Sequence, residues 1–314
     1  MRVVVTGGTG FVGAHLARKL ATRGDKVTCL DVVRSSPLLD GMDEVRIVRC
    51  DIAAWSETFH ALKAAQPEIV FHSAGILSAF AEERPQAAYQ VNATGTYNVL
   101  EAAVLLEIPQ VVFTSTIATY GPDVGTVVDE NSLQRPTTMY GVTKTFGELL
   151  GSYYLRRFGV DFRGIRLASV IGPGRGPGGA SAYSSLIVSE PARGRPFTVP
   201  TNEGTTMPLL YVKDAVSALI QIAEADGSAL RRRVYGVTGF SPNARVLRDA
   251  VLEVVPDAHI DFQPDPAIVT IADGWPDRLD DSEAAQDWGW QPAYDLESAV
   301  EDFVAELRAH PDWP

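Results

Sequence analysis

The sequence predicts an α/β protein built on a doubly wound parallel sheet, and three observations support this prediction. In the first half of the chain, short Val- and Ile-rich runs alternate with longer stretches of helical periodicity, which is typical of βαβ units. The short runs are apolar throughout, as expected for strands that helices cover on both faces. A glycine-rich turn at Gly7–Gly13 also joins the first expected strand to the first expected helix.

The alternation places the individual elements. Strands are expected at Arg2–Thr6, Lys26–Asp31, Val45–Cys50, Ile69–His72, Val111–Ser115, Phe162–Ala168 and Arg233–Val237. Helices are expected at Gly13–Thr22, Ser56–Gln66, Gln86–Leu106, Tyr140–Phe158 and Lys213–Ala225. The last of the strands is expected to return to the main sheet.

The character of the chain changes after the sixth strand. Residues Gly172–Gly179 read Gly-Pro-Gly-Arg-Gly-Pro-Gly-Gly, which predicts a loop, because neither a helix nor a central strand accommodates them. Such a loop is either a plain connector or a source of substrate contacts at the sheet edge. We expect a sheet domain over residues 1–168, to which residues 207–237 return, and a smaller C-terminal α/β substrate lobe from residues 169–206 and 238–314.

Composition narrows the range of partners. The chain has 314 residues, 46% of them hydrophobic and 21% charged, which is ordinary for a globular enzyme. Its 27 Lys and Arg against 39 Asp and Glu give a net charge of −12, which disfavours nucleic acid and anionic membranes as partners. The apolar run at the start is too short for a signal peptide or a membrane span, so a cytoplasmic location is expected.

Metal binding and disulfides are not expected. Cys29 and Cys50 fall in predicted strands and are expected to be free, buried thiols. No metal site is predicted, because the histidines are scattered through the sequence, at His15, His60, His72, His259 and His310.

The glycine turn has the spacing of a dinucleotide site. Gly7, Gly10 and Gly13 follow a strand directly and open a helix, and Gly8, Gly10 and Gly13 also fit the G-x-G-x-x-G pattern. Glycine lets the backbone approach a pyrophosphate closely, and the N–H groups of the helix start hold the anion. Asp31 ends the second strand, where a carboxylate would accept hydrogen bonds from the adenosine ribose.

Asp31 also favours NAD over NADP, because a carboxylate repels a 2′-phosphate. Arg34 lies near enough in sequence to moderate that preference. Asp51 ends the third strand and precedes Ile52, so this pair would either flank the adenine or cap the following helix. The sequence therefore predicts a Rossmann-type fold with NAD as its cofactor.

Tyr140 and Lys144 form the predicted catalytic pair. Four residues apart on a helix, they share one face. A neighbouring ammonium is expected to lower the phenol pKa from about 10, so that the phenolate can take a proton from an alcohol. The hydroxyls of Thr114–Thr116 end a strand at the same sheet edge, where they either bind a substrate oxygen or cap a turn.

Together, TGGTGFVG (residues 6–13), Asp31, HSAG (72–75), TSTIATYG (114–121) and YGVTK (140–144) resemble the extended short-chain dehydrogenase/reductase family, in its NAD-dependent epimerase/dehydratase branch. The resemblance implies that Tyr140 is the general acid/base, that Lys144 binds the nicotinamide ribose, and that Thr116 is the catalytic hydroxyl. Asn92 is expected to be structural. The implied NAD contacts are Gly7, Thr9, Gly10, Phe11, Val12, Gly13, Asp31, Arg34, Asp51, Ile52, Ser73, Ala74, Gly75, Thr114, Tyr140 and Lys144.

Several segments resemble the epimerase-like L-threonine 3-dehydrogenases within this branch. They are Leu77–Ala79, Thr114–Ala118, Met207–Tyr211 and Trp275–Trp290. Sugar-nucleotide enzymes of the branch usually carry an Asn after the Arg166 strand and an Arg–Asp-type pair before the Tyr211 segment. Ala168-Ser169 and Met207–Leu210 stand there instead, which leaves a diphosphate few partners.

Other positions depart from the threonine group. Leu167-Ala168-Ser169 replaces a Tyr-Pro-Gly segment, Thr206 stands where that group has a basic residue, and Gly178–Ser185 resembles dehydrogenases of sugar acids such as erythronate. The resemblance therefore implies oxidation of the secondary alcohol of a small polar substrate, either a hydroxy amino acid such as L-threonine or a sugar acid. The candidate substrate-binding residues are Ser78, Thr116 and Ser181.

Two alternatives stay open. The chain could be an NDP-sugar 4-epimerase with tightly bound NAD, or a non-catalytic NAD-sensing protein, although such sensors usually lack the tyrosine or the lysine. The resemblance also implies a homodimer that pairs the helices Gln86–Leu106 and Tyr140–Phe158. The apolar positions that suit a dimer interface and burial within one chain equally well are Leu149, Leu150, Tyr153, Tyr154 and Phe158.

Overall fold

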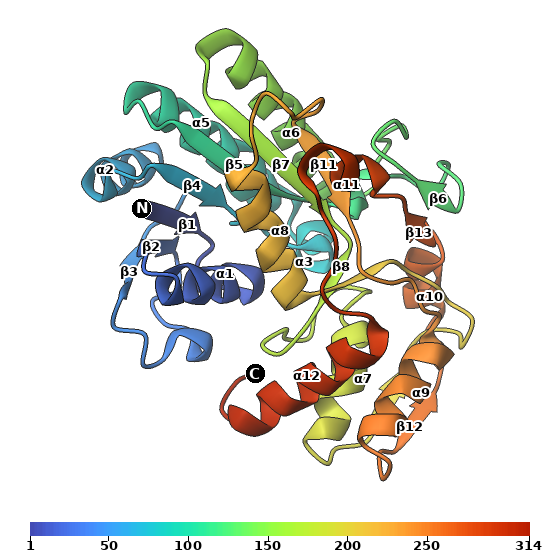
Figure 1. The fold of residues 1–314 in the computed structure, drawn as a ribbon. Helices are drawn as coiled ribbons and strands as arrows, with labels where there is room; N and C mark the ends of the chain where they lie inside the picture. The colour runs from blue at the N-terminus through green and yellow to red at the C-terminus, as the bar shows by residue number, and fades with distance from the viewer.

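The largest sheet has seven parallel strands in a computed structural model that describes all 314 residues. Its strands are β1 (Arg2–Thr6), β2 (Lys26–Asp31), β3 (Val45–Arg49), β4 (Ile69–His72), β5 (Gln110–Thr116), β7 (Asp161–Leu167) and β11 (Val234–Val237). They are ordered β11-β7-β5-β4-β1-β2-β3 (Figure 1), and each neighbouring pair is parallel. The order reverses direction beside β1, as in a Rossmann-type doubly wound sheet, so the predicted fold class is confirmed.

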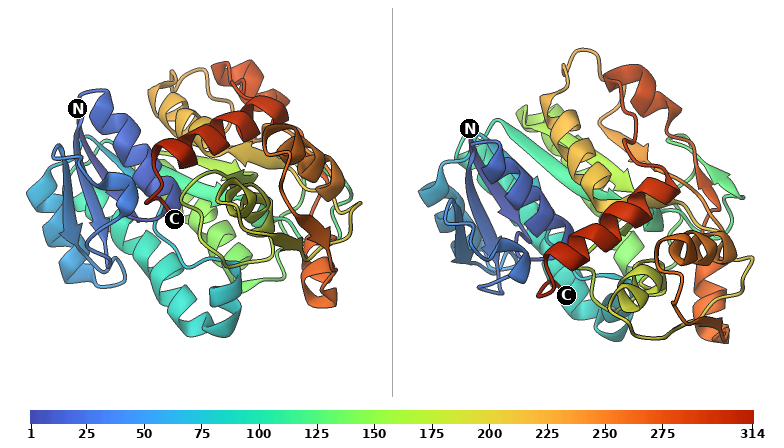
Figure 2. Two further views of the ribbon diagram at one scale, coloured as in Figure 1. Left: turned by 90° about the horizontal axis from the view of Figure 1, so that it is seen from below. Right: turned by 60° about the horizontal axis from the view of Figure 1, so that its bottom comes forward.

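Helices cover both faces of this sheet (Figures 1 and 2). The helices α2 (Trp55–Ala65), α5 (Gly95–Leu105) and α6 (Met139–Phe158) pack together on one face, and α1 (Phe11–Thr22) and α8 (Val212–Glu224) pack together on the other. Successive residues of β1 point to opposite faces: Val4 packs under α5, whereas Val3 and Val5 belong to the core beneath α1 and α8. Burial on both faces explains why the strands are apolar throughout.

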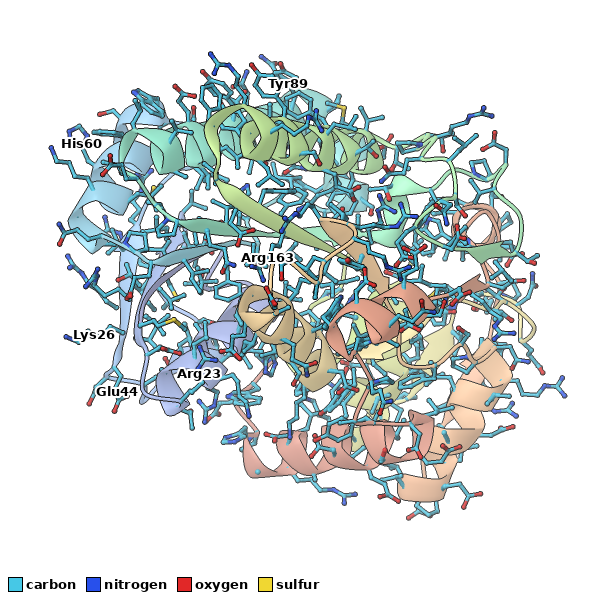
Figure 3. All side chains as sticks on the ribbon, turned by 45° about the horizontal axis from the view of Figure 1, so that its top comes forward. Arg23, Lys26, Glu44, His60, Tyr89 and Arg163 are labelled. Carbon is cyan, nitrogen blue, oxygen red and sulfur yellow. The ribbon has the colours of Figure 1, made fainter.

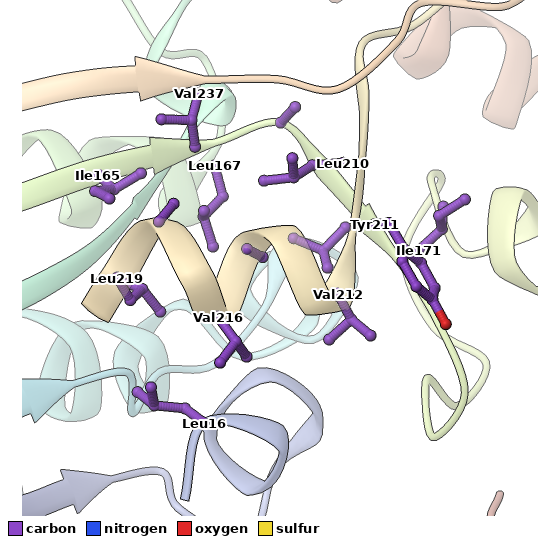
Figure 4. Close-up of a cluster of buried hydrophobic side chains, with 14 of the residues drawn as sticks. Leu16, Ile165, Leu167, Ile171, Leu210, Tyr211, Val212, Val216, Leu219 and Val237 are labelled. Atoms are coloured by element: carbon purple, nitrogen blue, oxygen red, sulfur yellow. The ribbon is translucent and has the colours of Figure 1, made fainter. Parts of the chain in front are cut away.

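Helix α8 packs beside α1 and covers β5 and β7 on the same face of the sheet. Val216 and Leu219 of α8 are buried between Leu16 of α1 and the β7 side chains Ile165 and Leu167 (Figure 4). This layer anchors a late segment of the chain against the first βαβ unit.

An arginine also fastens the end of α8 to the sheet. Arg163 of β7 lies beside α8 (Figure 3) and donates to the main-chain carbonyls of Ile222 at 2.7 Å and Ala225 at 2.6 Å. These carbonyls have no partner inside the helix, so a buried cation is well placed to satisfy them. Arg163 is itself paired with Asp161, at 2.7 Å.

The remaining elements lie mostly beyond the carboxyl ends of the strands. They are η1 (Pro37–Leu39), α3 (Ser78–Glu83), α4 (Pro85–Ala88), η2 (Tyr89–Thr94), η3 (Ile117–Thr119), β6 (Val127–Val128), β8 (Ser169–Ile171), α7 (Tyr183–Ala192), β9 (Phe197–Val199), β10 (Leu209–Tyr211), α9 (Ala244–Val254), β12 (Ile260–Phe262), α10 (Pro266–Ala272), β13 (Arg278–Leu279), α11 (Ser282–Trp288) and α12 (Leu296–Ala309). Three small parallel pairs form here: β8 with β10, β9 with β12, and β6 with β13.

The chain passes repeatedly between the large sheet and these smaller elements. β8 follows β7 almost directly and pairs with β10, and β10 runs straight into α8. β11 then joins the edge of the large sheet beside β7. Helix α12 packs on α7 and α9 and completes the smaller set of elements (Figure 2).

The predicted helix Gln86–Leu106 is a compound structure. It consists of α4, the π-helical turn η2 and α5 in succession, and Asn92 lies in the π-turn. The Asn92 amide accepts from the Ile76 N–H at 2.7 Å and donates to the Ile76 carbonyl and the Thr143 hydroxyl, both at 3.0 Å. As expected, Asn92 is a structural residue, which fixes the segment after β4 against α6.

Cys29 and Cys50 are both buried, and burial raises their pKa values to about 12 and about 11. No three or more His, Cys, Asp and Glu side chains come together in a way that could hold a metal ion. None of the helices combines the length and apolarity needed to cross a bilayer.

Candidate active site

A cleft of about 840 Å³ opens at the carboxyl ends of the parallel strands. Most of the predicted site residues line it: Gly7, Gly10, Phe11, Val12, Gly13, Asp31, Asp51, Ile52, Ser73, Ala74, Gly75, Ser78, Thr114, Thr116, Tyr140, Lys144 and Ser181. Thr9 and Arg34 were also predicted to contact the cofactor but do not line the cleft. The Thr9 N–H instead supports Asp31, at 3.1 Å from its Oδ2, and Arg34 is exposed.

The glycine turn can hold a diphosphate closely against the backbone. Gly7 has a φ of +68°, in the left-handed region, and a Cβ on Gly13 would lie 2.1 Å from the Gly7 carbonyl oxygen. Helix α1 begins at Phe11, and no side chain caps it. The N–H groups of its first turn are therefore available to an anion, so these residues fit a dinucleotide diphosphate.

Asp31 faces the cleft from the end of β2. Its carboxylate accepts from the N–H groups of Thr9 and Val33, each at 3.1 Å, which fixes its orientation. A carboxylate has further lone pairs, so it can still accept from ribose hydroxyls. Asp51 also lines the cleft, and its carboxylate accepts from the Ala53 N–H at 3.0 Å. It does not cap α2, because no side chain caps that helix, so the adenine contact is the remaining prediction for Asp51.

Tyr140 is buried in the first turn of α6. The Thr138 hydroxyl caps this helix by accepting from the Gly141 N–H at 3.1 Å. Burial raises the pKa of Tyr140 to about 12, and the Thr116 hydroxyl and the Arg175 guanidinium oppose that rise. The sequence-based expectation of a pKa lowered by Lys144 is therefore wrong, because burial dominates and the helpful cation is Arg175.

The Lys144 amine is held at the end of β5. Its Nζ donates to the Thr114 carbonyl at 2.8 Å and lies 5.8 Å from the centre of the Tyr140 ring. Burial lowers the pKa of Lys144 to about 8, although Glu148 acts in the opposite direction. Lys144 thus shares the helix face of Tyr140, as predicted, but its amine is committed to the strand.

A buried polar network behind the site fixes α6 to two strands. Glu148 of α6 pairs with Arg166 of β7 at 2.7 Å and accepts from the Ser115 hydroxyl of β5. Arg166 also donates to the Tyr120 hydroxyl at 2.9 Å. Because Ser115 is committed to Glu148, Thr116 is the hydroxyl of its strand end that acts on Tyr140.

Sequence reasoning missed two conspicuous residues of the cleft. Arg175 and Trp275 both line it, although neither was among the predicted site residues. Arg175 lies in the loop Gly172–Gly179 and donates to the Ser181 hydroxyl at 2.7 Å and to the Val170 carbonyl. A single arginine in a Gly/Pro loop just past a strand is the signal that could have identified it.

A Rossmann-type sheet, an uncapped glycine turn and a Tyr–Lys–Thr group at the strand ends define an enzyme that uses a nicotinamide dinucleotide. The chain belongs to the NAD dependent epimerase/dehydratase family, whose family model matches residues 3–237. NAD is therefore its cofactor.

Relatives with known names support the same assignment. The chain is 33% identical to the mitochondrial L-threonine 3-dehydrogenase of Sus scrofa, over 98% of this chain and 83% of the pig protein. The holo form of a GalE-like L-threonine dehydrogenase from Cupriavidus necator superposes with a TM-score of 0.92 at 32% identity, over 98% of this chain and all of the other. A monomeric L-threonine 3-dehydrogenase from a metagenome gives 0.91 at 29% identity, covering 98% and 99% of the two chains.

Proposed function

We propose that this protein is an NAD-dependent dehydrogenase that oxidises the secondary alcohol of a small polar substrate, a hydroxy amino acid such as L-threonine or a sugar acid. One observation carries the proposal. A single cleft brings Tyr140 and Thr116 together with the dinucleotide turn and Asp31. The likeness to L-threonine 3-dehydrogenases over nearly the whole chain supports the same reaction class.

Tyr140 is the proposed acid/base. Its ionised form takes the proton of the substrate hydroxyl while a hydride leaves the carbon that bears this hydroxyl, and in reduction its phenol returns the proton to the oxygen. Bound NAD⁺ supplies the hydride acceptor. Because the pKa of Tyr140 is raised to about 12, the free protein holds the phenol protonated at neutral pH. Oxidation is therefore favoured by alkaline conditions.

Thr116 and Lys144 complete the proposed machinery. The Thr116 hydroxyl favours the phenolate of Tyr140 and can hydrogen-bond the substrate oxygen as it becomes a carbonyl. Lys144 is the proposed partner of the nicotinamide ribose hydroxyls, since an ammonium has three donors and the Thr114 carbonyl takes one of them. Ser78 and Ser181 remain the proposed contacts to the polar part of the substrate.

The segment before α8 argues for a small substrate. Met207, Leu209 and Leu210 are fully buried in the core, so they offer no charge to a sugar-nucleotide diphosphate. Tyr211 is buried as well, and its hydroxyl donates to Asp302 at 2.7 Å. A bound diphosphate would therefore find no counter-charge along this segment.

The test combines cofactor reduction with a search for isomerised sugar. The purified protein is incubated with NAD⁺ and, in turn, hydroxy acids, hydroxy amino acids and UDP-sugars, while NADH absorbance and sugar stereochemistry are followed. We expect the wild-type protein to form one NADH for each molecule of a small alcohol that it oxidises. The Tyr140→Phe variant is expected to form none. If a UDP-sugar is epimerised without net formation of NADH, the protein is an epimerase and the proposal fails. If NAD binds but no substrate turns over, the protein is a non-catalytic NAD sensor and the proposal fails as well.

We also propose that two copies associate through α5 and α6. Leu149, Tyr153 and Phe158 of α6 are exposed, and Leu149 is the most exposed of them at 64%. Tyr154 is instead buried within the chain, with its hydroxyl donating to Glu101 at 2.7 Å. An apolar stripe of this kind on one helix favours a partner surface of the same composition.

A further inference from the structure

Arg175 is a cation without an acidic partner at the edge of the candidate active site. It lines the cleft, and no ion pair of the structure includes it. Its guanidinium donates to the Ser181 hydroxyl at 2.7 Å and to the Val170 carbonyl. Since a guanidinium has five N–H donors, three are left for another molecule.

The surroundings of Arg175 leave its charge uncompensated. Burial lowers its pKa to about 10, and the only group that acts in the opposite direction is Tyr140. A half-buried cation with no acidic neighbour is well placed to gain from an anion that joins it. The influence of Arg175 on Tyr140 also places the guanidinium within electrostatic range of the reacting alcohol.

The other charges of the cleft are engaged elsewhere. Asp31 and Asp51 lie at the ends of β2 and β3, on the dinucleotide side. Lys144 is held by the Thr114 carbonyl. Glu83 of α3 is the remaining acid that lines the cleft, and it is exposed. Arg175 is therefore the one cation free to receive a charged group of the substrate.

We propose that Arg175 binds a carboxylate of the substrate and thereby makes the site specific for hydroxy acids. The inference rests on the proposed dehydrogenase function, and it assigns to Arg175 the recognition of the acid group that the proposed substrates share. A planar guanidinium matches a carboxylate with two parallel hydrogen bonds. A single free cation suits one carboxylate better than the several charges of a sugar-nucleotide diphosphate.

The loop around Arg175 leaves room for such a ligand. Gly176, Gly178 and Gly179 line the cleft together with Arg175, and a Cβ placed on any of the three would meet no atom within 4 Å. Gly178 and Gly179 also have φ values of +136° and +82°, which other residues adopt only with strain. The loop therefore contributes Arg175 to the cleft wall without adding bulky side chains at these three glycine positions.

The experiment compares acids with uncharged counterparts of the same shape. The substrate pairs are L-threonine with L-threoninamide, and C3–C6 aldonates such as D-erythronate with the matching alditols. The quantity measured is the ratio of kcat/KM for the acid to kcat/KM for its uncharged partner. The variants are Arg175→Met, Arg175→Lys and, as the surface control, Arg195→Met, because Arg195 is exposed and paired with Glu190.

Loss of a charge-assisted, bidentate contact predicts a fall in this ratio of about 100-fold in Arg175→Met. A smaller fall of about 10-fold is expected in Arg175→Lys, which keeps the charge but not the fork. Arg195→Met should leave the ratio unchanged. An unaltered ratio in Arg175→Met would overturn the inference. If both substrates lose activity equally, Arg175 acts only through Tyr140, and if neither loses activity, Arg175 does not act on the substrate.

A binding measurement separates this inference from the proposed function. The wild-type protein with bound NADH is titrated with the same acids, and NADH fluorescence is followed. If no alcohol is oxidised but the acids bind and Arg175→Met abolishes that binding, the dehydrogenase proposal fails and the carboxylate site stands. If none of the acids binds, or if UDP-glucose binds through Arg175 instead, the carboxylate site is refuted.

Discussion

The Lys144 ammonium donates to the Thr114 carbonyl at 2.8 Å, which holds a buried charge at the end of the central strand β5. Only 3% of the Lys144 residue is exposed. Its pKa is lowered to about 8 because burial penalises the charged form. The protein therefore maintains an unfavourable charge at the point where the cofactor ribose is proposed to bind.

Replacing Lys144 with Met is expected to stabilise the protein while abolishing activity. Between the lowered pKa of about 8 and the ordinary value of 10.5, the unfolded chain binds the lysine proton and the folded chain does not. Wild-type stability consequently rises with pH across this window, by up to roughly 3 kcal/mol, and the full cost is present below it. Lys144→Met should thus raise the free energy of unfolding at pH 7, and the gain should shrink towards pH 10. Urea unfolding at several pH values measures this, and a less stable variant at pH 7 would contradict it.

Tyr140→Phe is expected to reduce alcohol oxidation by at least about 1,000-fold while leaving NAD binding intact, since it removes only the acid/base group. In the wild type, oxidation should speed up from pH 7 to pH 10, because the raised pKa of about 12 means that more phenolate forms as pH increases. Initial rates against pH, with NAD affinity measured separately, provide the check. Parent-level oxidation in the variant would remove Tyr140 from the mechanism.

Asp31→Ala should weaken NAD binding by about 10-fold, because a carboxylate facing the ribose hydroxyls is lost. Binding of NADP should weaken less or improve, since the repulsion of its 2′-phosphate disappears. Calorimetric titration with both dinucleotides gives the ratio of the NAD affinity to the NADP affinity. Asp43→Ala removes an exposed acid away from the cleft and serves as the control. Unchanged selectivity in Asp31→Ala would exclude this carboxylate from cofactor choice.

Gly13→Ala is expected to cost roughly 3 kcal/mol of stability and to weaken NAD binding strongly, because the new methyl would overlap main-chain atoms that cannot move freely. Its Cβ would lie 2.1 Å from the Gly7 carbonyl oxygen. Gly204→Ala is the matched control, as its Cβ would meet nothing within 4 Å and its φ is not positive. The unfolding temperatures of Gly13→Ala and Gly204→Ala are compared with and without NAD. Equal unfolding temperatures in the two variants would argue against a tight glycine turn.

Leu149→Glu combined with Tyr153→Glu should yield monomers if two copies associate through α6. Both side chains are exposed, so charges there are tolerated by the monomer but disfavoured in an apolar interface. Sedimentation velocity reports the mass. Glu101→Gln, which alters a residue committed to Tyr154, tests whether any loss of association follows merely from a disturbed helix. A wild-type protein that sediments as a monomer would refute the proposed dimer directly.

Much of the fold was predictable because periodicity reflects burial. The five regular runs from β1 to β5 are buried on at least one face by helices, and their Val and Ile content marks them in the sequence. β8 and β10 were not predicted, since three residues carry too little pattern. The π-turn at Tyr89–Thr94 was also missed, because a widened turn leaves the apolar spacing nearly unchanged.

The site was predictable where residue type alone determines the chemistry. Gly13, Asp31 and Tyr140 line the cleft because spacing along a strand or helix fixes their positions. The pKa of Tyr140 was not predictable, since it depends on burial and on a cation that lies 35 residues away in the chain. Arg175 was missed for the same reason: a loop has no periodicity that indicates which way its side chains point.

The late arrival of α8 and β11 has a consequence for synthesis on the ribosome. Until Glu224 has emerged, α8 does not cover Ile165, and until Val237 has emerged, the outer edge of β7 has no neighbouring strand. A nascent chain of about 200 residues therefore exposes an apolar, unpaired strand of the kind that recruits chaperones or aggregates. Translation speed through this stretch should govern how much active protein a cell recovers.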